Sequence, residues 1–480
     1  MASSSISVRE YPFLLGGRWV NEGEGLEVHS PFDNSVVGQT FRATRAEAES
    51  AVTAAVRAFE ITRRMPAVER YRALRHVSDG LTARRADFAR IIALEAGKPI
   101  KTARAEVERA AFTFHVAAEE AERIGGEYLP MDLQQATVGR WALVRRFPIG
   151  PVLAITPFNF PLNLVAHKLA PAMAAGCTVV LKPATKTPLS SLGLAQLIQE
   201  ANWPEGALNV VPLSNEDAEP LVRDDRLKLL SFTGSAKVGW QLKSQAGKKR
   251  VGLELGGNAG CIIHRDADLK YAAERCAVGG FSYAGQSCIS VQRILVEQSV
   301  MQPFLDLFVP MVQRLKTGDP LDEATDVGPM IQESEAVRAE SWVKEAVNAG
   351  AKLLCGGGRR GALLEPTVLT RTTPQMRVNC EEVFAPVVTV EPYDDFDAAL
   401  ARVNDSLYGL QAGLFTNDAR LIFRAYEELE VGGVIVGDMP TFRIDHMPYG
   451  GVKDSGNTRE GLKYAIEEMT ERKLLVMNLR

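Results

Sequence analysis

Between residues 150 and 255, short runs of apolar and β-branched residues alternate with segments long enough to be helices. Consecutive parallel strands need a long crossover connection, usually a helix, so this alternation predicts βαβ units that build a parallel sheet. The helices are expected at residues 162–175 and 189–201. The strands are expected at residues 150–156, 177–182, 208–212, 228–232 and 251–255.

The rest of the chain divides into three further kinds of sequence. From Thr44 to Ile124 the apolar residues recur at helical spacing, which indicates several long helices. A second β/α series begins near Gly260 and indicates another α/β domain. The stretches 126–147 and 472–478 fit neither series and are predicted as edge strands, which another subunit commonly covers. The strands of the second series are expected at residues 261–264, 293–297, 352–355, 387–390, 413–415 and 433–436.

Length and charge narrow the class of protein. At 480 residues the chain exceeds the size at which one hydrophobic core keeps growing, so several domains are expected. The formal net charge of −4 provides no excess positive field for phosphates, which argues against nucleic acid or a membrane surface as a partner. Met1 and the serines after it are followed by charge and a proline, and no uncharged apolar run could span a bilayer. A cytoplasmic protein is therefore predicted.

The six cysteines are dispersed, without the C-x-x-C pairs of zinc or redox sites. We therefore expect reduced thiols and no metal site. Cys288 ends the run Gly285-Gln286-Ser287-Cys288, after a glycine-containing aromatic stretch that should end a helix and leave the thiol on a loop. A cysteine in such a sequence can also be an inert core residue. Packing roles are expected for Cys177, Cys261, Cys276, Cys355 and Cys380.

Glu254 lies in the apolar strand expected at residues 251–255, next to Gly256 and Gly257. Burial raises the pKa of a carboxyl group towards neutrality, which suits a base that takes a proton from water. A thiol and such a base can together trap an aldehyde and hydrolyse the resulting thioester. The alternative for Glu254 is a structural ion pair.

Asn159 lies just past the strand that ends at Thr156. Pro157 and Pro161 flank it and should stiffen the loop, so that the amide points inward as a donor to an oxyanion. The alternative is a turn asparagine whose side chain bonds its own backbone.

Signals for a nucleotide lie on the first β/α series. Gly234 and Ser235 follow an apolar strand, and residues 236–245 can form a helix whose first amides would face a pyrophosphate. Gly234 and Gly239 have the outer spacing of a P-loop, but Trp240 replaces its lysine, which disfavours nucleoside triphosphate chemistry. Lys182, at the carboxyl edge of the sheet, could donate to ribose hydroxyls or be an ordinary surface lysine.

In their order and spacing these segments resemble the NAD(P)-dependent aldehyde dehydrogenase superfamily, over nearly the whole chain. The strings that carry the resemblance are GPVLAITPFNFPL, GCTVVLKPATKTP, LLSFTGS, LELGG, GQSC, EEVFAP and MPYGGVKDSG. It implies an α/β, aldehyde dehydrogenase-like fold with two Rossmann-like parallel-sheet domains and a small β element for assembly into a homodimer or homotetramer. The implied divisions are 1–125 with 148–257 for NAD(P) binding, 258–450 for catalysis, and 126–147 with 470–480 for oligomerisation.

By this resemblance Cys288 is the nucleophile, Asn159 and the Cys288 backbone amide form the oxyanion hole, and Glu254 activates the water that releases the acid. Glu471 matches a position that some members use as a second acid in proton relay. The implied cofactor is NAD or NADP. Lys182 would bind the adenine ribose, Ser235 the pyrophosphate, and Glu382 with Phe384 the nicotinamide ribose. Further cofactor contacts are implied for Ile155, Thr156, Pro157, Phe158, Ala184, Thr185, Phe232, Gly234, Val238, Leu255 and Gly256.

Departures from the common pattern refine these expectations. Thr185, followed by Lys186, occupies the position where many NAD-preferring members carry a glutamate that repels a 2′-phosphate, so both NAD and NADP should bind. The chain looks most like the lactaldehyde-like branch, but Ser287 replaces the arginine that members with anionic substrates often carry there. Without that guanidinium, a small or medium uncharged aldehyde, hydroxylated or not, is preferred. The candidate pocket residues are Arg109, Phe160, Phe281, Ser287, Phe442 and Arg443.

Three other functions compete with this interpretation. A CoA-acylating aldehyde dehydrogenase would pass the acyl group to CoA, but such enzymes typically lack the base that Glu254 supplies. A thiol or serine hydrolase is the remote alternative, with Ser341 and Lys344 as an S-x-x-K pair inside an amphipathic helix. A binding protein without activity would not need Cys288, Glu254 and Asn159 together.

Overall fold

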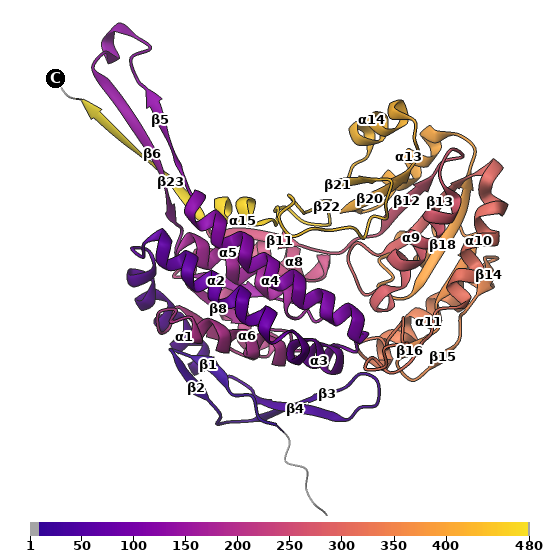
Figure 1. Cartoon of the computed structure of the whole chain (residues 1–480), viewed down its shortest axis with the longest axis horizontal. Coiled ribbons are helices and arrows are strands. Elements are labelled where there is room, and N and C mark those ends of the chain that lie inside the picture. The colour runs from indigo at the N-terminus through magenta and orange to yellow at the C-terminus, as the bar shows by residue number, and fades with distance from the viewer. Residues whose placement is uncertain (1–8, 479–480) are drawn as a thin grey trace, which may run out of the picture.

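The computed structural model describes residues 9–478. Two α/β bodies lie side by side, and a narrow arm of strands projects from the first body (Figure 1). Residues 1–8, part of the opening stretch from which a cytoplasmic protein was predicted, lie outside the described part. Residues 479–480 of the predicted last oligomerisation strand also lie outside it. Within residues 9–478, no helix has the length and apolar character to cross a membrane. The cytoplasmic location stays a prediction.

The first body is built on a seven-stranded sheet. All five strands predicted for it form and pair in parallel. They are β7 (Val152–Ile155), β8 (Val179–Lys182), β9 (Leu208–Val210), β10 (Leu229–Thr233) and β11 (Arg250–Glu254). The sheet is not purely parallel, because β1 (Phe13–Leu15) joins β9 antiparallel and is itself paired with β2 (Arg18–Val20).

The order of the sheet fixes where a ligand can enter. It is β11-β10-β7-β8-β9-β1-β2, so that β7 lies in the middle although it precedes the other parallel strands in the chain. From β7 the chain first extends the sheet towards β9 and then returns to add β10 and β11 on the other side. Such a reversal leaves a crevice at the carboxyl ends of the two strands beside it, here β7 and β10.

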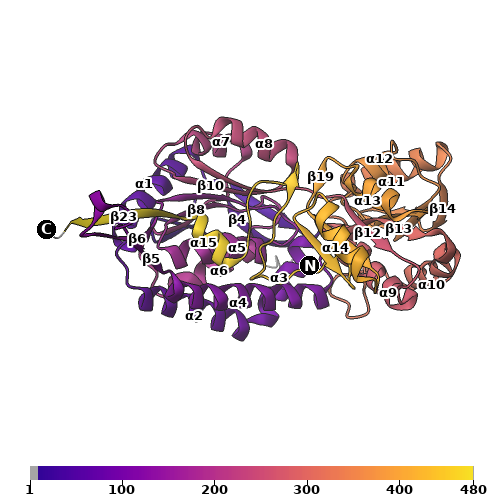
Figure 2. The same ribbon diagram turned by 90° about the horizontal axis from the view of Figure 1, so that it is seen from above.

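Helices cover both faces of the first sheet. The predicted helical region forms four helices, and α2 and α4 lie across the sheet from α7 and α8 (Figure 2). α5 is buried along its whole length, including Pro171 inside it. The helices are α1 (Arg45–Thr62), α2 (Ala67–Ala83), α3 (Arg85–Ala96), α4 (Ile100–Arg123), α5 (Asn163–Ala175), α6 (Leu189–Glu200), α7 (Asn215–Arg223) and α8 (Ala236–Gln245).

The second body holds another seven-stranded sheet, in the order β14-β17-β18-β13-β12-β20-β21. The six predicted strands form, β17 was not predicted, and β14 pairs with it antiparallel. The strands are β12 (Ala259–Ile263), β13 (Val291–Glu297), β14 (Lys352–Cys355), β17 (Thr367–Thr370), β18 (Val387–Tyr393), β20 (Gln411–Phe415) and β21 (Gly433–Val436). The helices are α9 (Leu269–Phe281), α10 (Met301–Gln313), α11 (Glu333–Asn348), α12 (Arg377–Cys380), α13 (Phe396–Asn404) and α14 (Ala419–Glu428).

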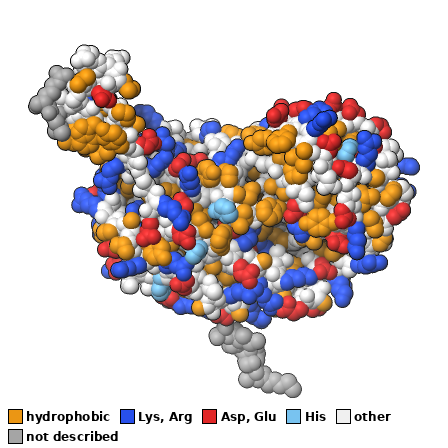
Figure 3. Space-filling view, turned by 45° about the horizontal axis from the view of Figure 1, so that its top comes forward, with side chains coloured by type: hydrophobic (Ala, Val, Ile, Leu, Met, Phe, Trp, Pro, Cys, Tyr) orange, Lys and Arg blue, Asp and Glu red, His pale blue; other side chains and the backbone are white. Residues whose placement is uncertain are grey.

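Both predicted edge stretches belong to one three-stranded antiparallel sheet, in the order β23-β6-β5. Its strands are β5 (Gly126–Pro130), β6 (Arg140–Pro148) and β23 (Thr470–Asn478). The sheet is the projecting arm, and apolar side chains gather on it (Figures 1 and 3). Its exposed apolar residues include Tyr128, Leu129, Leu133, Leu474, Leu475 and Val476.

The segment before β23 was not assigned by the sequence divisions. It carries α15 (Leu462–Glu468), which packs on α4 and α5 and adds Leu462, Ile466 and Met469 to the core of the first body. The chain therefore leaves the first body after β11 and returns to it near its end. Smaller pairs are β3 (Gly25–His29) with β4 (Val36–Phe41), β15 (Arg359–Arg360) with β16 (Leu363–Leu364), and β19 (Tyr408–Gly409) with β22 (Val452–Lys453).

The cysteines follow the predicted pattern with one exception. All six are free thiols, and Cys177, Cys261 and Cys276 are buried. Cys380 is exposed, so its predicted packing role is wrong: it ends the short helix α12 at the surface of the second body.

Candidate active site

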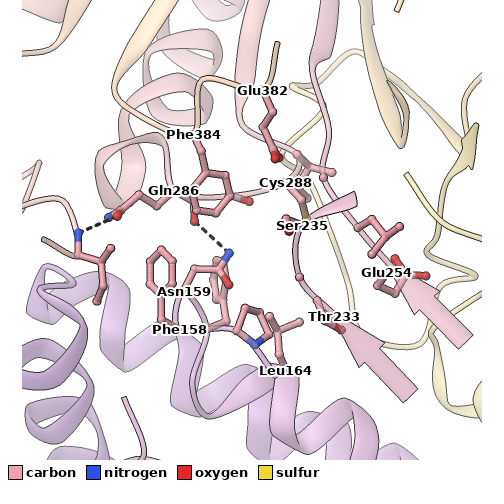
Figure 4. Close-up of a pocket in the computed structure, with 18 of the residues that line it drawn as sticks. Phe158, Asn159, Leu164, Thr233, Ser235, Glu254, Gln286, Cys288, Glu382 and Phe384 are labelled. Carbon is pink, nitrogen blue, oxygen red and sulfur yellow. Dashed lines mark hydrogen bonds between the residues drawn. The ribbon is translucent and has the colours of Figure 1, made fainter. Parts of the chain in front are cut away.

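A cavity of about 430 Å³ lies where the two bodies meet. The first body supplies the loops after β7, β10 and β11, at the crevice that its strand order predicts. The second body supplies the loop before β13 and part of the segment between β18 and α12. Figure 4 shows side chains of both bodies turned towards this space.

Cys288 reaches the cavity through an unusual piece of backbone. After α9, the short 3-10 turn η2 (Ser282–Gly285) contains Tyr283, Ala284 and Gly285 in succession with φ of 50°, 53° and 68°. Left-handed φ values are costly for Tyr and Ala and persist only where packing enforces them. Here both side chains are buried. The reversal places the Cys288 thiol at the cavity, 2.9 Å from the Tyr449 hydroxyl, and burial raises the pKa of the thiol to about 12.

Asn159 follows β7 and is almost completely buried. Its Nδ2 donates to the backbone carbonyl of Gln286, two residues before Cys288, at 3.1 Å. Its Oδ1 is buried without a hydrogen-bond partner. The side chain therefore bridges the two bodies beside the thiol, as Figure 4 shows. The alternative, a turn asparagine bonded to its own backbone, does not describe this bond.

Glu254 is the last residue of β11 and is buried beside the cavity. Neither carboxylate oxygen has a hydrogen-bond partner in the described part of the chain. Burial raises the pKa of this carboxyl well above its ordinary value, and the nearby Glu460 raises it further, against the opposing charges of Arg443 and Lys168. A structural ion pair would bring a cation within bonding distance of Glu254, and none of the ion pairs among residues 9–478 includes it.

Buried polar atoms without a partner gather at this cavity. Eleven such side-chain atoms occur among the described residues, and five of them belong to cavity residues: Asn159 Oδ1, Thr233 Oγ1, Arg443 Nε and both oxygens of Glu254. Unsatisfied buried polar groups are rare in folded proteins and need an explanation. Their clustering indicates that a polar ligand completes the site.

The starts of three helices decide where a pyrophosphate can bind. α5 and α6, which follow β7 and β8, have their first amides occupied: Glu106 accepts from Leu162 and Asn163, and Glu95 from Leu189 and Ser190. α8, which follows β10, begins at Ser235 without a side-chain cap, and Gly234 and Ser235 line the cavity. The open amides of α8 fit an anionic phosphate group.

Two further features fit a dinucleotide. Lys182 ends β8 beside Ile155 of β7, and burial lowers the pKa of its ammonium to about 8. Glu382 accepts a hydrogen bond from the Gly257 amide at 2.8 Å and packs so close to Gly256 that a Cβ there would collide with its carboxylate. The carboxylate thus lies at the cavity wall, where ribose hydroxyls could donate to it.

The predicted cofactor residues divide into two groups. Those that line the cavity are Pro157, Phe158, Gly234, Ser235, Leu255, Gly256, Glu382 and Phe384. Those that lie on the strand ends and on α8 without lining the cavity are Ile155, Thr156, Lys182, Ala184, Thr185, Phe232 and Val238. Lys186, which follows Thr185, does line it.

Three predicted site residues do not line the cavity and are corrected here. Phe281 is buried in the core of the second body, where its ring packs against Phe308. Phe442 is 43% exposed and is not among the residues that line the cavity. Glu471 begins the exposed part of the arm and forms an ion pair with Arg250 at 2.6 Å. Of the other pocket predictions, Arg109, Phe160, Ser287 and Arg443 line the cavity.

Comparison with known proteins agrees with this geometry. Residues 19–475 match the model of the Aldehyde dehydrogenase family. The chain belongs to the aldehyde dehydrogenase family. A 3-sulfolactaldehyde dehydrogenase from Priestia aryabhattai is 46% identical over 478 residues, which cover 99% of this chain and 100% of the relative. A lactaldehyde dehydrogenase from Methanocaldococcus jannaschii is 40% identical over 471 residues, covering 97% and 100%.

Two solved structures are similar throughout. Aldehyde dehydrogenase 21 from Physcomitrella patens, crystallised with the reaction product succinate, has a TM-score of 0.97 and 46% identity, covering 98% of this chain and 99% of its own. A glyceraldehyde-3-phosphate dehydrogenase from Methanocaldococcus jannaschii, complexed with NADP, has a TM-score of 0.92 and 40% identity, covering 96% and 100%. The predicted α/β fold and the resemblance to the lactaldehyde-like branch are confirmed. The protein is an aldehyde dehydrogenase that uses NAD or NADP.

The structure of this aldehyde dehydrogenase also reveals cavity residues that the sequence analysis missed. Glu460 lines the cavity and forms ion pairs with Arg443 at 2.8 Å and with the buried Lys168 at 3.9 Å. Tyr449 contacts the thiol, and the Arg443 guanidinium lies over its ring. Tyr449 belongs to the C-terminal string MPYGGVKDSG that carried the family resemblance, and Glu460 lies four residues after the end of that string. No spacing rule links that string to residue 288, so only folding could bring them together.

The S-x-x-K pair of the hydrolase alternative lies elsewhere. Ser341 and Lys344 are on the exposed side of α11, where Lys344 pairs with Glu340 and Ser341 donates to a backbone carbonyl of its own helix. Neither residue lines the cavity.

Proposed function

We propose that this enzyme oxidises a small aldehyde to the carboxylic acid through a thioester on Cys288, which water activated by Glu254 then hydrolyses. The observation that carries the proposal is the convergence at one cavity of a thiol, a bridging amide and a carboxylate without hydrogen bonds. These three groups supply a nucleophile, an oxyanion donor and a base.

The first step needs a base because the thiol is protonated at neutral pH. Attack of Sγ on the carbonyl carbon forms the C–S bond of a thiohemiacetal, and the thiol proton passes to Glu254, directly or through water. Among the carboxylates that line the cavity, Glu335, Glu382 and Glu460 already have protein partners. Glu254 has none and its raised pKa suits it to accept a proton near neutrality.

The oxyanion that forms on the former carbonyl oxygen would be held by Asn159 and the Cys288 amide. One Nδ2 hydrogen of Asn159 is engaged with Gln286, which fixes the orientation of the amide group, and the other remains for the oxyanion. A donor that is already oriented needs no reorganisation during the reaction. We expect Asn159 to stabilise the tetrahedral state.

The nucleotide would lie along the carboxyl ends of β7, β8 and β10. The α8 amides with Ser235 would bind the pyrophosphate, Lys182 the adenine ribose, and Glu382 with Phe384 the nicotinamide ribose. In that position the nicotinamide ring would supply a hydride acceptor next to the thiohemiacetal carbon, and the oxidised product held on Cys288 would be the thioester. Phe384 has a positive φ and packs edge to face against Phe158, so it can shield this end of the cavity from water.

Release of the acid would again use Glu254, which first passes the thiol proton to solvent and then deprotonates the attacking water. The C–O bond of the acid forms, the C–S bond breaks, and the Cys288 sulfur takes back a proton. This role argues for hydrolysis rather than transfer to CoA. A CoA-acylating enzyme needs no such base. The two mechanisms therefore differ in whether turnover requires Glu254 and in whether it requires CoA.

The test of this proposal is aldehyde-dependent reduction of the nicotinamide cofactor, with and without CoA, in the native chain and Cys288→Ala. We expect CoA-independent reduction that the variant abolishes. Reduction only with CoA would favour the acylating mechanism. Unchanged cofactor reduction in the variant would show that Cys288 is not the nucleophile. Ester cleavage that needs no cofactor and is faster than aldehyde oxidation would favour the thiol hydrolase.

For the substrate we propose a small or medium uncharged aldehyde, with or without a hydroxyl group. Four cationic and four anionic side chains line the cavity, so its formal charge is balanced. Arg109 donates to Asp445 through Nε at 3.2 Å and Nη2 at 2.7 Å, and Arg443 pairs with Glu460. Guanidinium groups already neutralised in this way attract an anionic substrate weakly.

A second candidate is an aldehyde with an anionic group, because Arg109 Nη1 has no hydrogen-bond partner among the described residues. The Priestia relative acts on 3-sulfolactaldehyde, and the Physcomitrella structure holds succinate. The two candidate substrate classes are distinguished by measuring kcat/KM for lactaldehyde and for succinic semialdehyde, both in the native chain and in Arg109→Gln. An anion held by Arg109 predicts a loss of about tenfold or more for the semialdehyde alone. An equal, small effect on both substrates supports the uncharged class.

We further propose that NAD and NADP both serve as cofactor. Thr185 and Lys186 are exposed where a 2′-phosphate would meet the protein, and neither repels it. Initial rates with each cofactor test this expectation, which a markedly weaker response to NADP would contradict.

The arm would assemble the enzyme into a homodimer or homotetramer. β5 and β23 are edge strands of a three-stranded sheet, and the arm exposes Tyr128, Leu474 and Leu475. Unpaired edges and apolar surface of this kind favour association with another copy. Light scattering would measure the assembly, and a monomer at micromolar concentration would refute it.

A further inference from the structure

Lys98 lies in the turn between α3 and α4, and its side chain is completely buried. Its Nζ is 3.6 Å from the centroid of the Phe160 ring and 4.4 Å from that of Tyr283. The two rings meet edge to face, with centroids 6.2 Å apart. A single desolvated cation thus lies against two aromatic rings, an arrangement in which cation–π attraction is at its strongest.

The two rings belong to the two loops that carry the chemistry. Phe160 directly follows Asn159 in the first body, and its ring lines the cavity. Tyr283 belongs to the left-handed turn five residues before Cys288 in the second body. Its hydroxyl donates to the Ala96 carbonyl at the end of α3, at 2.9 Å. Lys98 therefore contacts the ring of Tyr283, and Ala96, two residues earlier, accepts a hydrogen bond from its hydroxyl.

The carboxylate that neutralises Lys98 extends the same connection. Glu106 accepts from Lys98 through Oε2, and through Oε1 it accepts from the Leu162 and Asn163 amides at 3.0 and 3.1 Å. These amides start α5, the helix that follows the Asn159 loop. Lys98 thus contacts Phe160, and Glu106 contacts the residues two and three places after it.

Stability alone explains this pair poorly. The free-energy cost of desolvating two charges often offsets their mutual attraction. Replacing a buried ion pair by apolar residues of similar volume frequently leaves a folded protein equally stable or more stable. The pair lies instead between two loops whose relative position decides whether the Cys288 thiol and the Asn159 amide can act on one carbonyl group. Misplacement by about 1 Å can lower a rate about 100-fold.

We propose that Lys98 is a positioning residue: its buried ammonium, held by Glu106, clamps Phe160 and Tyr283 and so sets the Asn159 loop of one body against the Cys288 loop of the other. The inference rests on the proposed roles of Cys288 and Asn159. The proposed role involves no contact between Lys98 and the substrate. Lys98 acts only through the Phe160 and Tyr283 rings.

The test uses a double variant, because Lys98→Met alone leaves Glu106 as an uncompensated buried charge. Lys98→Met with Glu106→Gln removes both charges, fills the lysine volume and keeps a side-chain oxygen for the two α5 amides. Three quantities are measured: the single-turnover rate of cofactor reduction at saturating aldehyde, the Kd of the cofactor and the Tm. The matched control is Lys101→Met, one helical turn away, whose exposed ion pair with Asp326 also joins the two bodies.

The clamp predicts a single-turnover rate about 10- to 100-fold below that of the native chain, with Kd and Tm unchanged. The control should match the native chain in all three measurements. A folded double variant with the native rate overturns the inference, as does a loss that appears equally in rate, Kd and Tm. If the double variant does not fold, Lys98→Gln with Glu106→Gln, which keeps a hydrogen bond without the cation, is measured in the same way. A native chain that does not oxidise aldehydes refutes the proposed function, whereas a fast double variant refutes only the clamp.

Discussion

Glu95 and Glu106, in the helical layer of the first body, and Glu254, at the cavity, are all almost completely shielded from solvent. They differ in their partners. Glu95 and Glu106 accept the first amides of α6 and α5, and Glu106 also pairs with Lys98. Neither oxygen of Glu254 accepts a hydrogen bond from any residue between 9 and 478. The hydrogen bonds in the helical layer thus offset part of the desolvation cost of its carboxylates, although burial still raises the pKa of Glu95 to about 7. Glu254 has no such hydrogen bond from any described residue.

The difference separates structural from chemical use of the same side chain. A carboxylate that accepts several backbone amides stabilises one arrangement of the chain, and its oxygens are already engaged. A desolvated carboxylate without partners is costly to the fold but keeps both oxygens for a reaction. We therefore propose that Glu95 and Glu106 position the loops of the site and that Glu254 takes part in the reaction.

Glu254→Gln gives the largest expected effect. Steady-state turnover should fall about 10²- to 10⁴-fold because the thioester loses the base for its hydrolysis. A single burst of cofactor reduction should remain, since formation of the thioester precedes the blocked step. Stopped-flow absorbance of the reduced cofactor measures both phases.

The control for this prediction is Glu471→Gln, which replaces the carboxylate that the structure places outside the cavity. It should turn over like the native chain. Normal steady-state turnover in Glu254→Gln would show that another group is the base. The distinction between structural carboxylates in the helical layer and a reactive carboxylate at the cavity would then be wrong.

Glu106→Ala and Glu95→Ala should lose stability instead. Glu106→Ala leaves a buried ammonium uncompensated, and we expect a loss of about 3–5 kcal/mol. Glu95→Ala leaves only neutral donors unpaired, with an expected loss of about 1–3 kcal/mol. Denaturant unfolding at one fixed protein concentration measures both. Glu108→Ala, on the exposed side of α4, is the control and should change stability by less than about 0.5 kcal/mol.

The smallest expected effect is a gain in stability of about 1 kcal/mol for Glu254→Gln, which removes the uncompensated carboxylate. Because the pKa of Glu254 is raised in the folded state, the folded chain retains this proton over a pH range in which the unfolded chain has lost it. The native chain therefore loses stability as pH rises through that range, and the non-titrating glutamine does not. The Tm difference between the two should grow from pH 5 to pH 8. A difference that shrinks with pH would mean that Glu254 has a partner in the folded protein.

Much of the fold could be predicted from local sequence. The eleven predicted strands of the two sheets form because their alternation with helix-length segments is a property of neighbouring residues. The other strands of the two sheets were not predicted: β1, β2 and β17 are short strands whose place depends on distant partners. The family resemblance pointed to Cys288, Glu254 and Asn159, and all three line one cavity.

The sequence by itself determined the two α/β series, the βαβ connections and the residue types available for thiol chemistry, because these follow from spacing along the chain. Only the tertiary structure decided that Glu460 and Tyr449 return to the cavity, that Glu471 and Phe281 do not, and that Lys98 lies between the two catalytic loops. The physical reason is that burial and pairing depend on every element packed around a side chain. A carboxylate that accepts two amides and one that accepts none can look alike in sequence, and only the folded chain shows which of them keeps its oxygens unbonded.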